Sequence, residues 1–200
     1  MLESLQSLIQ DYPLIEQYWP VMPAILAGLL VLLARLRKPL HHWRQERQIA
    51  RAIRRLGAKT MKNVHLPDGM GAEVVIEYLL LTRDAILVVD VNRFNGLIFG
   101  GKHTDEWTQV INKCSYRFPN PDHYLQQQIG AVRTLLPKTR VEGIHLFTHD
   151  AEFPRDKPPS VLQLKDIRKK PRRPRLKDIP KGLRAAWKEL NDYVSTGRRD

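Results

Sequence analysis

The chain has 200 residues, and 33 lysines and arginines against 21 aspartates and glutamates give it a formal net charge of +12. This excess favours a polyanionic partner, either nucleic acid or anionic lipid headgroups. Hydrophobic residues make up 42% of the chain, which is enough to bury a core and excludes full disorder. The single cysteine, Cys114, excludes a disulfide framework and a cysteine-based zinc site.

The first predicted element is an uncharged apolar run over residues 18–34, YWPVMPAILAGLLVLLA. Its length, at about 1.5 Å per residue, approaches the thickness of a bilayer core. Basic residues follow from Arg35 onward, whereas residues 1–17 carry acids and no lysine or arginine. The positive-inside rule then predicts a transmembrane helix over residues 18–36, a short extracytoplasmic N-terminus over residues 1–17 and a cytoplasmic remainder. We therefore expect a single-pass protein of the inner or plasma membrane.

Two alternatives to this anchor are weaker. A cleaved signal peptide needs a basic start and a small-residue cleavage site, but this N-terminus is acidic and the apolar run ends in arginines. A buried core helix is the second alternative, because the run is short and Pro20 and Pro23 interrupt its start. Prolines near a helix N-terminus are tolerated, since those N–H groups lack helical partners. The transmembrane interpretation is therefore favoured.

The next segments predict a helix, a connection and three strands. Residues 40–56 show helical periodicity, and residues 59–71 are polar with a turn signal. Two β-branched runs joined by a four-residue link predict an antiparallel hairpin, and a short third strand after a glycine turn is predicted to lie adjacent to them. These strands are predicted over residues 74–81, 86–91 and 97–99.

The second half of the chain predicts a helix, two further strands and a basic tail. The helix spans residues 122–136 and is stopped by Pro137; the strands span residues 141–147 and 161–164. This order indicates an α/β or α+β domain with a mixed central sheet over residues 40–165. Beyond it, residues 166–200 are predicted to form an extended basic linker rich in proline, followed by an amphipathic helix over residues 182–193.

Acidic residues inside apolar strands are the most informative chemical feature. Glu77 lies in the middle of one hairpin strand and Asp90 at the end of the other, so the two should lie roughly opposite each other. Glu46 lies on the core-facing stripe of the preceding helix and could complete an all-oxygen site. Mg²⁺ and Mn²⁺ prefer such ligands, and metal-assisted phosphodiester hydrolysis uses them. The alternatives are solvent-exposed strand carboxylates and a salt bridge from Glu46 to a nearby arginine.

Several motifs together resemble the nuclease-related domain (NERD) family over residues 43–165. The motifs are IEYLLLTRDAILVVDVNRFNG at residues 76–96, WTQ at 107–109, the Asn120-Pro121 pair with QQQ at 126–128, and VEGIHLF at 141–147. This family is similar to the PD-(D/E)XK nucleases. The resemblance implies a restriction-endonuclease-like mixed sheet flanked by helices, preceded here by one transmembrane helix, with metal-dependent cleavage of nucleic acid.

The resemblance assigns roles to four residues of this chain. Glu77 matches the acid of the first strand, Asp90 the acid of the second strand and Glu46 the acid of the helix. The implied metal ligands are therefore Glu46, Glu77 and Asp90, and the implied catalytic residues are Asp90, Glu77 and Asn92. Asn92 stands where the acid-x-lysine motif has its lysine, which would position the attacking water and stabilise developing negative charge. Asparagine donates hydrogen bonds but brings no charge.

Two hypotheses follow for the whole chain. The first is a membrane-anchored nuclease-related protein that contacts DNA or RNA, uses Mg²⁺ or Mn²⁺ and has an impaired active site. The second is a catalytically inactive interaction or scaffold module at the cytoplasmic membrane face, whose basic segments bind anionic lipid headgroups. His145 is expected to have no functional role, and Trp107 and Trp187 are expected to be core residues.

Overall fold

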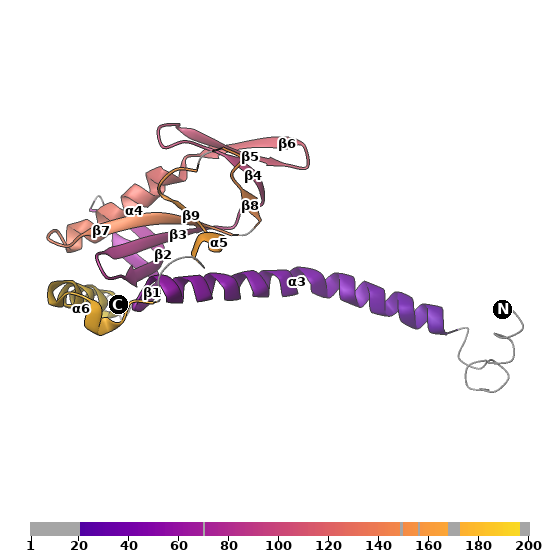
Figure 1. Ribbon diagram of the computed structural model, residues 1–200, viewed down its shortest axis with the longest axis horizontal. Coiled ribbons are helices and arrows are strands. Elements are labelled where there is room, and N and C mark those ends of the chain that lie inside the picture. Colours follow the sequence, from indigo (N-terminus) through magenta and orange to yellow (C-terminus); the bar gives the residue numbers. More distant parts are fainter. Residues whose placement is uncertain (1–20, 70, 149, 156, 168–172, 197–200) are drawn as a thin grey trace, which may run out of the picture. The chain divides into compact units, whose positions relative to one another are not determined.

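The computed structural model describes residues 21–196, except for residues 70, 149, 156 and 168–172. The chain divides into two compact units, Met1–Glu46 and Arg47–Asp200. Helix α3 (Met22–Leu56) contributes to both units and contains Pro39. Figure 1 labels the helices and strands of the chain.

The described part of the first unit is the N-terminal portion of α3, whose large apolar side chains are exposed. These are Val21, Met22, Ile25, Leu26, Leu29, Leu30, Val31, Leu32 and Leu33. Across the described part of the chain, no helix combines the length and the apolar character that crossing a membrane requires. The transmembrane helix predicted over residues 18–36 is therefore not found, and residues 18–20 of that prediction lie outside the described residues.

A five-stranded mixed sheet with the strand order β1-β2-β3-β7-β9 forms the centre of the second unit. Its strands are β1 (Lys59–Pro67), β2 (Glu73–Leu81), β3 (Ile86–Asn92), β7 (Val141–Phe147) and β9 (Val161–Gln163). Strand β2 is antiparallel to both β1 and β3, while β7 is parallel to both β3 and β9. The predicted hairpin, the strand over residues 141–147 and the mixed sheet are thus confirmed.

Strand β1 corrects the prediction of a polar connection over residues 59–71. It pairs with β2 along its whole length, from Lys59↔Leu81 to Pro67↔Glu73. Only Val64 and Leu66 of its nine residues are buried, because it is the edge strand of the sheet. Because this segment is mostly polar, its sequence pattern did not predict a strand. The strand is held mainly by backbone pairing with β2.

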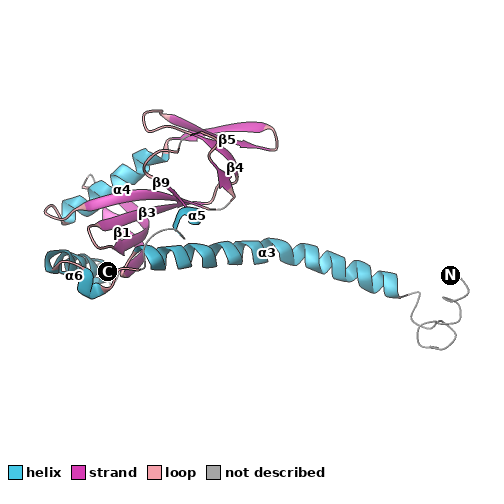
Figure 2. Cartoon of the chain, in the orientation of Figure 1, coloured by secondary structure: helices cyan, strands magenta, loops and turns pink. Residues whose placement is uncertain are grey.

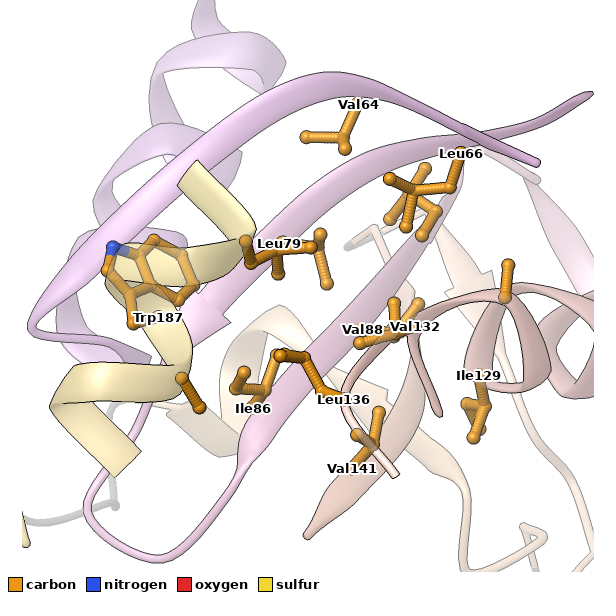
Figure 3. Packing of buried hydrophobic residues seen from close by; sticks show 14 of the residues in the cluster. Val64, Leu66, Leu79, Ile86, Val88, Ile129, Val132, Leu136, Val141 and Trp187 are labelled. Atoms are coloured by element: carbon orange, nitrogen blue, oxygen red, sulfur yellow. The ribbon is translucent and has the colours of Figure 1, made fainter. Parts of the chain in front are cut away.

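One face of this sheet is covered by α4 (Pro121–Leu135) and α6 (Lys181–Thr196), as the close view of the packing shows (Figure 3). Trp187 of α6 is buried among strand residues such as Leu79 and Ile86, while Ile129 and Val132 of α4 lie near Val141. Helix α4 approaches β7 closely, since a Cβ on Gly143 would lie 2.6 Å from Ile129 Cδ1. The helices predicted over residues 122–136 and 182–193 are confirmed.

The opposite face is covered by the last turns of α3 and by the short helix α5 (Leu164–Ile167). Ile49 and Ile53 of α3 and Leu164 of α5 are buried in one cluster with strand residues that include Leu80 and Val89. The two hydrophobic clusters therefore lie on opposite faces of one sheet, as expected when side chains alternate along its strands.

A second, four-stranded sheet has the order β6-β5-β4-β8 (Figure 2). It comprises β4 (Gly96–Phe99), β5 (Glu106–Ile111), β6 (Cys114–Pro119) and β8 (Ala151–Glu152). The short strand predicted over residues 97–99 exists, but its predicted place beside the hairpin strands is wrong. The chain turns away at Gly96, whose φ of +79° and close approach to the Val110 carbonyl both require glycine.

Parts of the basic tail predicted over residues 166–200 are helical. The end of α5 extends into it and it contains the 3₁₀ helix η1 (Leu176–Asp178), while residues 168–172 lie outside the described residues. Arg173 donates hydrogen bonds to the carbonyl oxygens of Gly57 at 3.1 Å and Ala58 at 2.6 Å, just beyond the end of α3. After residues 168–172, the tail is therefore attached to the sheet domain through Arg173 and helix α6.

Candidate functional site

Asp90 and Asn92 lie on the face of the central sheet that α4 and α6 cover. They follow Val88 at two-residue steps, and Val88 belongs to the cluster on that face. The parallel pairing of β3 with β7 places His145 directly beside Asp90. Three polar side chains are thus gathered on neighbouring strands, near the ends of β3 and β7.

The imidazole of His145 lies between two carboxylates. Its Nδ1 is 3.0 Å from Asp90 Oδ2 and its Nε2 is 2.9 Å from Asp122 Oδ1, and the ring has no exposed surface. Each ring nitrogen therefore has a carboxylate beside it. The side chains of Asp90 and Asp122 are 22% and 18% exposed.

The first turn of α4 positions Asp122. Asn120 caps this helix by accepting a hydrogen bond from the Asp122 backbone N–H at 2.9 Å, and Pro121 occupies the first turn, where no N–H is needed. Ser160 donates a hydrogen bond to Asp122 Oδ1 at 3.0 Å, and its backbone oxygen accepts from the His145 N–H at 2.8 Å. Ser160 therefore joins the helix to the sheet at this site.

Asn92 donates a hydrogen bond to Asp90 Oδ2 at 2.7 Å, and its amide nitrogen lies 3.4 Å from His145 Nδ1. Asp90 Oδ2 therefore accepts from Asn92 and contacts His145 as well. Where the family pattern has a lysine, this chain has a buried amide that is directed back onto the neighbouring carboxylate.

Glu77 lies one residue beyond Tyr78↔Val89, where the pairing of β2 with β3 ends, so its position opposite Asp90 stays a prediction. The side-chain alternation of β2 shifts at this point, because Ile76 and Leu79 belong to the same cluster. Glu77 accepts two hydrogen bonds from Arg93, at 2.6 Å and 3.2 Å. Its carboxylate is therefore paired with a guanidinium.

Glu46 is half-buried on α3 and belongs to the first compact unit. Within the described residues, no group of three or more histidine, cysteine, aspartate or glutamate side chains is arranged to hold a metal ion. The chemistry of the donors agrees, because Asp90 is engaged by Asn92 and His145, and Glu77 by Arg93. As placed, these residues do not fit a three-ligand Mg²⁺ or Mn²⁺ site, and the ligand set stays a prediction.

Sequence reasoning missed His145, Asp122 and Ser160. A lone histidine in an apolar strand carries no signal by itself, and the three residues come from a strand, a helix start and a loop. Knowledge of the parallel register of β3 and β7 would have identified His145, because this register places it beside Asp90. Trp107 and Trp187 are buried core residues, as predicted.

Comparison with known proteins supports the family resemblance. The model of the nuclease-related domain family matches residues 41–148, more than half of the chain, and the range includes Glu46, Glu77, Asp90, Asn92, Asp122 and His145. This chain therefore belongs to the nuclease-related domain family.

One relative is an uncharacterized protein from Bacillus anthracis, which is 25% identical over 118 residues. The aligned region is 56% of this chain and 56% of that protein, so the chain spans little more than half the length of this relative. No solved structure matches the chain.

Proposed function

We propose that this chain binds nucleic acid through its nuclease-related domain and that phosphodiester cleavage at Asp90 is impaired. The observation that carries the proposal is the state of Asp90 within the family-matched range: its Oδ2 contacts both Asn92 and His145. The proposal takes the fold to be restriction-endonuclease-like, as the family resemblance implies.

Charge supports the binding half of the proposal. The net charge of +12 is the expected footprint of a protein that neutralises phosphates, and counterion release would make the binding steeply dependent on salt. Neither DNA nor RNA is favoured by these features, since the phosphate groups are common to both.

The contacts of Asp90 and Glu77 support the impairment. A divalent cation needs several oxygen ligands that are free to approach it. Here Asp90 contacts His145 and Asn92, and Glu77 is paired with Arg93. Asn92 also lacks the positive charge that a lysine would bring to the developing negative charge of the reaction.

The test is cleavage of supercoiled plasmid and single-stranded RNA by the full chain in Mg²⁺ or Mn²⁺. The wild type is expected to cut slowly or not at all, Asp90→Ala to remove any cutting, and Asn92→Lys to increase it. Rapid metal-dependent cleavage by the wild type would overturn the impairment. Cleavage that Asp90→Ala leaves unchanged would place the chemistry elsewhere.

A second proposal concerns the first unit: we infer that its exposed apolar stretch attaches the protein to a lipid bilayer. Supporting it are the exposed large apolar side chains from Val21 to Leu33, followed in the sequence by Arg35, Arg37 and Lys38. Basic residues beside an apolar stretch favour anionic headgroups on the cytoplasmic side. Flotation of the full chain with anionic vesicles tests this, with Leu29→Asp/Leu30→Asp as the variant expected to stay unbound. Equal flotation of both proteins would exclude this stretch as the attachment site.

A further inference from the structure

A pocket of about 570 Å³ lies on the face of the central sheet opposite Asp90. Three arginines from the last turns of α3 line it: Arg51, Arg54 and Arg55. Buried apolar residues of α5, Leu164 and Ile167, line it as well. All of the lining residues belong to the second compact unit. Its volume lies within the range that small ligands and nucleotides fill.

The three guanidinium groups are exposed, and within the described residues none has an ion-pair or hydrogen-bond partner. Three like charges on successive turns repel one another, at a cost of a few tenths of a kcal/mol per pair at helical spacing. Asp166 lies on α5 between the lining residues Leu164 and Ile167, but it is already paired with Lys157. The pocket therefore keeps an uncompensated positive charge.

A structural explanation for these arginines is weak. Cations are stabilising at a helix C-terminus, and Arg54 and Arg55 do lie in the last turn of α3. However, Arg173 already donates to the carbonyl oxygens of Gly57 and Ala58 at that end of the helix. Arg51 lies a further turn away, beyond the reach of the terminal dipole. Three arginines around one pocket are better explained by an anionic ligand.

We propose that this pocket binds phosphate groups of a nucleic-acid strand. Guanidinium groups donate in a planar fork that matches phosphate oxygens, and they stack on bases, so arginine is well suited to this ligand. Leu164 and Ile167 form the apolar side of the pocket beside these phosphates. This inference rests on the proposed nucleic-acid function and names the surface that carries it, which is separate from the Asp90 site.

The test measures binding of a fluorescently labelled single-stranded oligonucleotide to the full chain by anisotropy, over a series of KCl concentrations. The pocket variant is Arg51→Gln/Arg54→Gln/Arg55→Gln. The matched control, Lys138→Gln/Lys181→Gln/Lys188→Gln, removes the same charge from exposed positions outside the pocket. The pocket variant is expected to bind about tenfold or more weakly and to lower the salt slope by about 2, the value for three phosphates of a single strand. The control is expected to change affinity by less than about threefold.

Each other outcome overturns a defined part of the argument. No binding by the wild type overturns the proposed nucleic-acid function and this inference with it. Normal binding by the pocket variant, or equal losses in the pocket and control variants, overturns the pocket alone. The same proteins are also tested on vesicles of phosphatidylcholine and phosphatidylserine. A pocket variant that loses vesicle binding but keeps oligonucleotide binding would make this a lipid-headgroup site. Circular dichroism of both variants should match the wild type, since the altered side chains are exposed.

Discussion

The two faces of the central sheet differ in how their charged side chains are paired. On the α4 face, His145 is buried between Asp90 and Asp122, and Asn92 and Ser160 complete the hydrogen bonds. On the α3 face, Arg51, Arg54 and Arg55 surround a pocket without carboxylate partners among the described residues. The polar groups around His145 are paired with one another, whereas the three arginines of the pocket are presented to solvent.

This contrast separates structural charge from charge that is available to a ligand. A buried network that is fully matched is costly to disturb, because removal of one member leaves the others unpaired in a low dielectric. Exposed like charges add little to stability and are better explained by a partner. The Asp90 site, which carries the family's acid motif, is therefore the more structural of the two sites. The arginine pocket, which carries no motif, has charge that is more available to a ligand.

The largest expected effect concerns how strongly the tail holds the α4 face together. Trp187→Ala should lower the free energy of unfolding by about 3–5 kcal/mol, because the indole is 4% exposed in the main cluster. Urea denaturation followed by circular dichroism measures it. Tyr193→Ala in the same helix is the control and should change stability by less than about 0.5 kcal/mol, since Tyr193 is 45% exposed. Equal effects would mean that α6 does not depend on its buried side.

A similar experiment tests whether the histidine network is structural. His145→Ala should cost about 3 kcal/mol, because it leaves Asp90 and Asp122 partly buried without their shared hydrogen-bonding partner. The arginine triple variant of the opposite face should change stability by no more than about 0.5 kcal/mol. Chemical denaturation of both variants gives the comparison. A His145→Ala effect as small as that of the arginines would abolish the distinction between the two faces.

A smaller effect is expected at the edge of the same network. Ser160→Ala removes one hydrogen bond to Asp122 and should cost about 1 kcal/mol. Thermal unfolding of the full chain measures the change. A loss above about 3 kcal/mol would show that Ser160 holds the His145 arrangement as a whole rather than contributing a single bond.

The smallest effect is a dependence on pH beside the arginine pocket. Partial burial opposes ionisation of Asp166, but hydrogen bonds from Lys157 and the Gln163 N–H outweigh it and lower the pKa of the Asp166 carboxyl. A lowered folded-state pKa contributes stability that is present above the unfolded value of 3.8 and is lost as pH falls through the folded value. Asp166→Asn should therefore reduce the thermal midpoint at pH 6 and have little effect at the lowest pH at which the protein stays folded. A difference that grows toward low pH would contradict this sign.

The sequence predicted the elements that are long and strongly patterned. Helices α4 and α6 have clear periodicity, the β2–β3 hairpin consists of two β-branched runs, and β7 is mostly apolar. The edge strand β1 was missed because few of its side chains are buried, and β5 and β6 were missed because they form a sheet whose residues are mostly half-exposed. Local pattern does not reveal which strands pair, so β4 was placed beside the wrong neighbours.

The candidate site was only partly predictable, for a related reason. Asp90 and Asn92 stand out because polar residues interrupt an apolar strand. The partner of Glu77 could not be read from the sequence, because the alternation of β2 shifts opposite Asn63, whose φ is +48°. Such a shift changes which face a strand residue occupies, and only backbone geometry reveals it.

The parallel pairing of β3 with β7 also affects how the protein folds. Strands β1, β2 and β3 are joined by short connections, whereas Asp90 and His145 are separated by 55 residues that include α4 and most of the second sheet. Closing so long a loop carries an entropic cost that hairpin formation avoids. The three antiparallel strands can therefore assemble early, and the Asp90–His145 contact can form only after the whole crossover has been synthesised and has docked.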